Sequence, residues 1–200
     1  MAGRRPSPPR PMIRRCSTLA FLLTVSVGLT ATAQEAATRQ AALVLRILSY
    51  DRNLSDRVSG RVTVLVVYRE SNGDSTSESR RIASALDALG RRTTVAGMNA
   101  RAVRLAYTSR SDLETAARRE GAAAVYVCEG LASSAGDISR AARGAHMLSL
   151  TSERRGLDRG LGVALVPDGS SVSLVVNLPA VEAEGARLDA AVLRLAEVIR

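Results

Sequence analysis

RVTVLVVY, the stretch from Arg61 to Tyr68, is a continuous run of apolar and β-branched residues. Such a run is typical of a strand buried on both faces of a sheet, because a strand with one solvated face would alternate apolar and polar residues. A second run of this kind, AAAVYVC, spans Ala122 to Cys128. Helical patterns lie between the two, from Glu78 to Leu89 and after Ser111. This alternation predicts an α/β fold, a single domain with a mainly parallel sheet flanked by helices on both faces.

The C-terminal part of the sequence predicts a hairpin and then a helix. Val163–Val166 and Val172–Val176 have strand patterns, and the residues between them, Pro167-Asp168-Gly169-Ser170, favour an antiparallel hairpin turn. Asn177-Leu178-Pro179 interrupts the second strand, and proline favours the first turn of a helix. We expect a terminal helix that runs to Arg200 and packs an apolar stripe on the sheet; a direct partner surface is the alternative. The stripe consists of Leu188, Val192, Leu195 and Ile199.

Residues 1–33 have the pattern of a secretory signal peptide. A basic start without acidic residues precedes an apolar run from Leu19 to Leu29, and Ala31-Thr32-Ala33 provides an A-x-A cleavage site. The run is shorter than the roughly 20 residues of a membrane-spanning helix, although an uncleaved anchor is the alternative. We expect cleavage near Ala33 and a mature domain, residues 34–200, in the periplasm.

Charge and composition argue against a nucleic-acid partner. The chain has a formal net charge of +9 at pH 7, and removing the five arginines of residues 1–33 lowers it to +4 (9 − 5). Aromatic residues make up only 2% of the sequence. Because nucleic-acid binding usually needs a dense basic patch, often with aromatic side chains on which bases stack, we expect no nucleic acid among the partners.

The mature sequence offers few residues for catalysis. His146 is the only histidine, and neither a G-x-S-x-G elbow nor a phosphate-binding glycine motif accompanies it. A zinc site would need three or four ligands. We therefore predict a protein that is not an enzyme, with no catalytic residue, no cofactor and no metal site. Cys128 is the only cysteine after residue 33, so an internal disulfide is excluded. We expect a buried, inert thiol, with an intermolecular bridge or a reactive thiol as the alternative.

Polar residues follow the predicted parallel strands. Ligands of parallel sheets bind beyond the carboxyl ends of the strands, where these residues should meet. They could line a cleft for a small solute, and ordinary solvated loop ends are the alternative. The candidate cleft residues are Tyr68, Arg69, Glu129, Thr151 and Ser152.

The C-terminal stretch from Leu150 to Ile199 resembles the signature of the YfiR family, a group of exported regulators. The shared pattern is a glycine-rich loop, a hairpin whose second strand ends in Asn, and a helix with an apolar end. The residues that carry it include Gly160, Gly162, Asn177, Leu195 and Ala196.

The resemblance implies a non-enzymatic periplasmic regulator that binds the periplasmic domain of an inner-membrane diguanylate cyclase and inhibits cyclic-di-GMP synthesis. A membrane-bound sensor or cyclase is thus the expected partner, and a homodimer is left open. Redox control by an internal disulfide, known in the family, should not transfer, because only Cys128 is available. A periplasmic small-solute-binding module is the alternative function, since many such proteins share this alternation of strands and helices.

Overall fold

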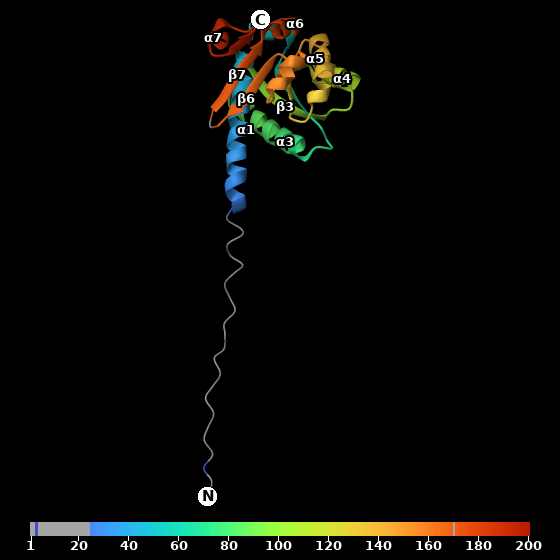
Figure 1. The fold of residues 1–200 in the computed structure, drawn as a ribbon. Coiled ribbons are helices and arrows are strands. Elements are labelled where there is room, and N and C mark those ends of the chain that lie inside the picture. Colours follow the sequence, from blue (N-terminus) through green and yellow to red (C-terminus); the bar gives the residue numbers. More distant parts are fainter. Residues whose placement is uncertain (1–2, 4–24, 170) are drawn as a thin grey trace.

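The computed structural model describes residue 3, residues 25–169 and residues 171–200 of the chain (Figure 1). Its helices, including the short 3-10 segments η1 and η2, are α1 Val25–Ser49, α2 Leu54–Arg57, α3 Gly73–Gly90, α4 Arg110–Glu120, η1 Ala132–Ser134, α5 Ala135–Gly144, η2 Arg154–Arg159, α6 Leu178–Ala183 and α7 Ala190–Leu193. Its strands are β1 Arg61–Tyr68, β2 Thr94–Val95, β3 Met98–Ala106, β4 Ala122–Val127, β5 Leu148–Thr151, β6 Val163–Asp168, β7 Ser171–Asn177 and β8 Glu197–Ile199.

Within the described residues the strands form one sheet in the order β2-β3-β1-β4-β5-β6-β7-β8. β1 pairs in parallel with β3 and β4, and the parallel pairing continues through β5 to β6. β6 and β7 form an antiparallel hairpin, and β2 pairs with β3 in the antiparallel sense. The predicted α/β fold, with a mainly parallel sheet and a C-terminal hairpin, is confirmed.

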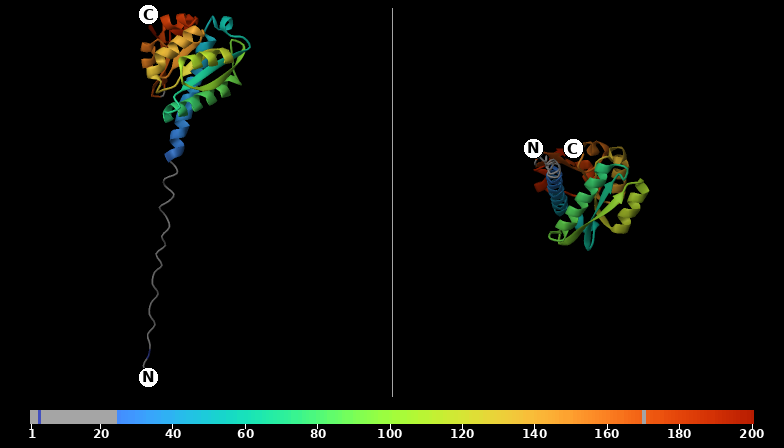
Figure 2. Two further views of the ribbon diagram at one scale, coloured as in Figure 1. Left: turned by 90° about the vertical axis from the view of Figure 1, so that its right-hand side faces the viewer. Right: turned by 90° about the horizontal axis from the view of Figure 1, so that it is seen from below.

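The continuous apolar run of β1 supplies both cores of the domain. Val64 and Val66 belong to the cluster beneath α1 and α3, whereas Leu65 and Val67 belong to the cluster beneath α4 and α5. All four side chains are fully buried. Because successive side chains of a strand point to opposite faces, only an unbroken apolar sequence can serve two helical layers. Figure 2 shows α1 and α3 side by side, and contacts between these two helices agree with that view.

Helix α1 is longer than the sequence pattern predicts. We expected a frayed lead over residues 34–40, yet these residues are helical and two of them, Ala37 and Gln40, are buried. They continue the buried face of Ala41, Val44 and Leu48 at helical spacing. The N-terminal turns of α1 project beyond the sheet in Figure 1.

The predicted signal peptide largely lies outside the described residues, and its last part, residues 25–33, belongs to α1. Among the described helices, none combines the length and hydropathy that a bilayer-crossing segment needs.

The expectation of one terminal helix that runs to Arg200 is wrong. The segment instead contains two short helices, α6 and α7, followed by β8, which pairs in parallel with β7. Gly185 breaks the helical path because its φ of 80° lies in the left-handed region. Leu188 then forms an isolated bridge with Asp51 at the end of α1.

The apolar stripe of that predicted helix is therefore divided. Leu188 and Val192 are buried as expected, but Leu195 is 74% exposed and Ile199 is 37% exposed. The prediction that Leu195 packs on the sheet is wrong, because it follows α7 on a turn rather than continuing a helix.

Candidate functional site

A buried carboxylate organises the carboxyl ends of β4 and β5. Glu78 of α3 is 8% exposed. Its Oε1 accepts hydrogen bonds from the Tyr126 hydroxyl and the Ser152 hydroxyl, each at 2.9 Å, and its Oε2 accepts one from the backbone N–H of Glu129 at 2.7 Å. Two of the predicted cleft residues, Glu129 and Ser152, are thus brought together by a side chain that the sequence analysis did not select.

The other predicted cleft residues lie apart from this carboxylate. Arg69 donates to the carbonyl of Gly130 at 2.8 Å and to the hydroxyls of Ser133 and Ser134, so it fastens the loops that follow β1 and β4. Tyr68 lies under the guanidinium of Arg104, 4.5 Å from the ring centroid. The contacts of Arg69 join the ends of β1 and β4, where ligands of such sheets usually bind, and the contact of Tyr68 joins β1 to β3.

Thr151 is also unavailable to a solute. It is 2% exposed, and its hydroxyl accepts a hydrogen bond from the backbone N–H of Glu153. The five predicted residues therefore do not line one common cleft.

A small cavity with both polar and apolar walls remains beside Glu78. It measures about 240 Å³ and lies between α1, α3 and the loops after β4 and β5. Burial, followed by the nearby charge of Glu78, raises the pKa of Glu129, and the same two causes raise the pKa of Tyr126 well above its usual value. Tyr126 therefore stays protonated and can donate. The lining residues are Ala33, Ala36, Ala37, Gln40, Glu78, Arg81, Ile82, Glu129, Ser152 and Pro167.

Cys128 is fully buried next to this network, as the sequence predicts. Burial is the main cause that raises the pKa of its thiol, and the charge of Glu78 adds to it. Because the thiolate is the reactive form, this thiol should react slowly in the folded protein.

An apolar groove of about 200 Å³ lies at a different place, where α1, β7 and α7 meet. Arg46 stands over Tyr50 at 5.9 Å from the ring centroid and is the charged residue of the lining. Single exposed leucines are common on protein surfaces, but an exposed Leu195 beside an apolar hollow is typical of a binding surface. The groove is lined by Leu43, Arg46, Ile47, Tyr50, Val172, Leu174, Ala191, Val192 and Leu195.

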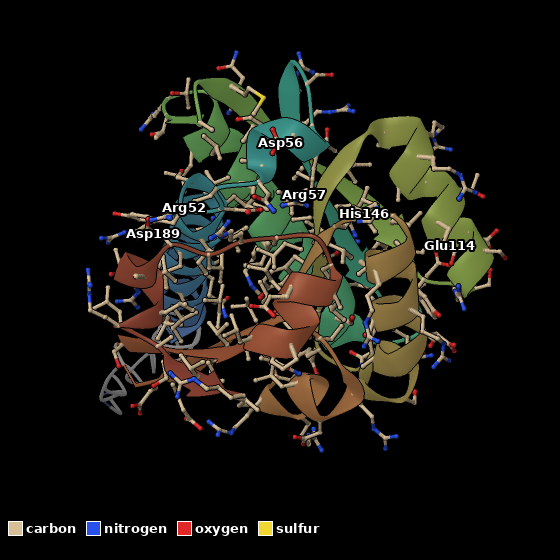
Figure 3. All side chains as sticks on the ribbon, turned by 90° about the horizontal axis from the view of Figure 1, so that it is seen from above. Arg52, Asp56, Arg57, Glu114, His146 and Asp189 are labelled. Carbon is tan, nitrogen blue, oxygen red and sulfur yellow. The ribbon has the colours of Figure 1, made fainter. Side chains whose placement is uncertain are left out.

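An ion pair fixes the short helix that forms one wall of this groove. Arg52, just after α1, binds Asp189 at 2.6 Å, and Asp189 caps α7 by accepting the backbone N–H of Ala191. Figure 3 shows Arg52 and Asp189 next to each other at the end of α1. α7 is too short to be stable alone, so this attachment to α1 holds the segment that presents Leu195.

One glycine of the predicted motif, Gly162, packs against a second buried carboxylate, that of Glu184. A Cβ on Gly162 would lie 2.7 Å from the Glu184 Oε2, so only glycine leaves room for that oxygen. Gly160 ends η2 with a φ of 90°, which favours glycine. Asn177 caps α6 by accepting the backbone N–H of Ala180. Gly162 and Asn177 thus shape the segments around Glu184, whereas Gly160 packs against Ser139 and Arg143.

The profile of a protein family described as YfiR/HmsC-like matches residues 37–197. The chain belongs to the YfiR/HmsC-like family. The resemblance stated from the C-terminal motifs is thereby confirmed, and the match covers almost the whole described domain. Membership in this regulatory, non-enzymatic family supports a role as a periplasmic regulator.

Solved structures with a similar fold have low sequence identity. A conserved domain protein from Vibrio cholerae O1 biovar El Tor has 17% identity and a TM-score of 0.60, over 82% of this chain and 60% of that chain. An ABC domain in complex with L-Trp from Streptococcus pneumonia has 14% identity and a TM-score of 0.54, over 76% and 60%. The ligand-free, open substrate binding protein CD0873 from Clostridium difficile has 13% identity and a TM-score of 0.52, over 74% and 57%.

The chain spans less than two thirds of each of these structures, and the likeness is one of fold. No curated protein sequence matches the chain.

Glu78 and the groove around Leu195 are the features that sequence reasoning missed. Glu78 lies four residues before Ile82 and eight before Leu86, so it shares their helical face. An acidic residue in line with an apolar stripe is the signal that could have identified a buried, hydrogen-bonded carboxylate. No comparable signal marks Leu195, because its apolar spacing also fits a buried helix.

Proposed function

We propose that this chain is a periplasmic, non-enzymatic regulator that binds the periplasmic domain of an inner-membrane diguanylate cyclase and lowers cyclic-di-GMP synthesis. The apolar groove around Leu195 is its binding surface in this proposal. The proposal also includes export to the periplasm, with cleavage of a signal peptide near Ala33. The groove is the observation that most supports this proposal, because a regulator that acts by contact needs a surface to which its partner can bind.

The chemistry of the groove suggests what kind of segment would bind. Its floor is apolar, from Leu43, Ile47 and Leu174, and Leu195 stands exposed at its side. Arg46 forms no ion pair within the described part of the chain, and its guanidinium lies over the ring of Tyr50. A partner segment with an apolar side chain and a nearby carboxylate would fill the groove and pair with Arg46.

The test compares cyclic-di-GMP levels in cells that lack the protein with those in cells that express the parent or Leu195→Asp. Cells with the parent should have the lowest level, and Leu195→Asp should restore the level of the deletion strain, because the substitution removes the apolar contact and its carboxylate would compete with the partner's carboxylate for Arg46. The purified periplasmic domain of the cyclase should bind the parent protein more tightly than it binds the Leu195→Asp variant.

Ala88→Asp is a matched control, since Ala88 is exposed on α3 and is not part of the groove lining. It adds the same charge and should repress like the parent. Equal cyclic-di-GMP levels in the deletion and parent strains would reject regulation of a cyclase. Repression that survives Leu195→Asp would instead reject the groove as the binding surface.

A small-solute-binding module is the second candidate, favoured by the cavity beside Glu78. One similar structure is described as a complex with L-Trp and another as a substrate binding protein. In this alternative the solute would bind Glu129 and Ser152, and cyclic-di-GMP would not depend on the protein. Saturable binding of an amino acid that Glu129→Gln abolishes, together with unchanged cyclic-di-GMP, would favour it.

A further inference from the structure

A hollow of about 310 Å³ opens at the amino ends of β1 and β3, at the opposite end of the sheet from Glu78. Figure 3 looks onto this end and shows Arg57 in its middle, with Asp56 and His146 on either side. Its volume is at the lower end of the range of small-molecule sites. The hollow is lined by Arg57, Val58, Ser59, Arg61, Thr63, Arg101, Glu120 and Gly121.

Positive charge exceeds negative charge around this hollow. Glu120 is the acidic residue of the lining, and it is already bound by Arg101 at 2.8 Å and by Arg119 at 2.9 Å. Both arginines lower the pKa of Glu120, with Arg119 the larger cause. Arg101 also donates from Nε to the Thr63 hydroxyl at 3.2 Å. Two arginines therefore share one carboxylate.

Arg61 adds a cation with no such partner. It begins β1, it is exposed, and its side chain takes part in no ion pair or hydrogen bond with the described residues. An arginine without a carboxylate on the rim of a basic hollow can turn its planar guanidinium toward an oxyanion.

Arg57 supplies a buried donor that lacks an acceptor. Its side chain is 8% exposed, one terminal nitrogen binds Asp51, and the other donates to the carbonyls of Ala123 and His146. Its Nε is buried without a hydrogen-bond partner among the described residues. A buried donor left unpaired is unfavourable, so an acceptor that reaches it would bind with a gain in free energy.

We propose that this hollow binds a phosphate group, held by Arg61 and Arg101 next to the buried guanidinium of Arg57. The arginine fork matches the tetrahedral oxygens of phosphate, and charge-assisted hydrogen bonds of this kind are strong. The hollow leaves room for a small polar group attached to the phosphate. A free phosphate compound and the phosphoglycerol headgroup of a membrane lipid both present this chemistry. The site is separate from the proposed groove, so either can fail without the other.

The experiment titrates the full mature protein with inorganic phosphate, and with vesicles of phosphatidylglycerol or of phosphatidylcholine, at constant ionic strength. Arg61→Gln is the test variant because Arg61 is exposed and should not be needed for folding. Arg155→Gln is the matched control: Arg155 is also exposed and lines another hollow, at the opposite end of the sheet. Unchanged melting temperatures of both variants verify that they fold.

We expect saturable binding that Arg61→Gln weakens about tenfold, the loss of one good charge-assisted contact, while Arg155→Gln leaves it unchanged. Binding of inorganic phosphate assigns the site to a free phosphate compound. Binding only to phosphatidylglycerol vesicles, with the same dependence on Arg61, assigns it to a lipid headgroup. No binding in either arm, or equal weakening by both variants, would overturn the proposal, because the second result indicates diffuse attraction by the net positive charge.

Discussion

The buried carboxyl group of Glu184 should make the stability of this protein fall as the pH rises. Glu184 is fully buried, and burial raises its pKa from 4.5 to about 8. The hydroxyl and the backbone N–H of Ser149 donate to it, and the charges of Arg143 and Arg57 act on it from α5 and α2. These contacts favour the charged form, but they do not compensate for burial.

Stability falls with rising pH because the folded state binds the Glu184 proton more tightly than the unfolded state does. Because the folded state keeps the Glu184 proton up to about pH 8 and the unfolded state releases it near pH 4.5, the contribution to stability is fully present below pH 4.5. It is lost progressively as the pH rises to about 8. Each pH unit in this window corresponds to about 1.4 kcal/mol, so raising the pH by two units within it should lower the free energy of unfolding by up to roughly 3 kcal/mol. For a domain of this size, that is a decrease in Tm of about 5–10 °C.

The assay is the melting temperature of parent, Glu184→Gln and Glu182→Gln between pH 5.5 and 7.5. Glutamine keeps the shape and can still accept from Ser149, so Glu184→Gln should remove most of the decrease in Tm with pH. Glu182 is exposed on the same helix and serves as the control, which should retain the slope of the parent. A Glu184→Gln protein with the parent's slope would show that another group causes the dependence and that the reasoning about Glu184 is wrong.

Three other experiments test the fold around the candidate sites. Leu195→Asp should change the free energy of unfolding by less than about 0.5 kcal/mol, because the side chain is 74% exposed; a large drop in Tm would mean that Leu195 is buried in solution. Gly162→Ala should lower the free energy of unfolding by about 1–3 kcal/mol, because the added Cβ would clash with Glu184. Gly73→Ala is the control, since a Cβ at Gly73 meets no atom and should leave the stability unchanged. Urea unfolding measures both values. Cys128 should react with a thiol reagent only after denaturant unfolds the domain, and rapid labelling of the native protein would contradict its burial.

The sequence predicted the central sheet well because its signal is local. In β1 and β4 every buried position except Thr63 is apolar, so the runs Arg61–Tyr68 and Ala122–Cys128 are typical of strands buried on both faces. The hairpin was equally clear, since its turn residues lie between two apolar runs.

The C-terminal segment was predicted wrongly because its signal depends on tertiary contacts. The spacing of Leu188, Val192 and Leu195 fits a helix, but the bridge from Leu188 to Asp51 and the pairing of β8 with β7 determine the conformation. The sheet edge overrides a weak local preference, and periodicity alone cannot report on it. The helical spacing of Glu78 could indicate that it is buried, but not its partners, which come from β4 and from the loops after β4 and β5.

The two outer edges of the sheet also bear on how this protein behaves at high concentration. β2 has two residues and β8 has three, so neither edge presents a long row of free backbone groups to another molecule. β7 is longer, and β8 pairs only with its Val175–Asn177 portion. If β8 detaches, an apolar strand gains an open edge that a second molecule could extend by strand addition. The tendency to form fibrils or linear assemblies should therefore be governed by how firmly three residues stay in place.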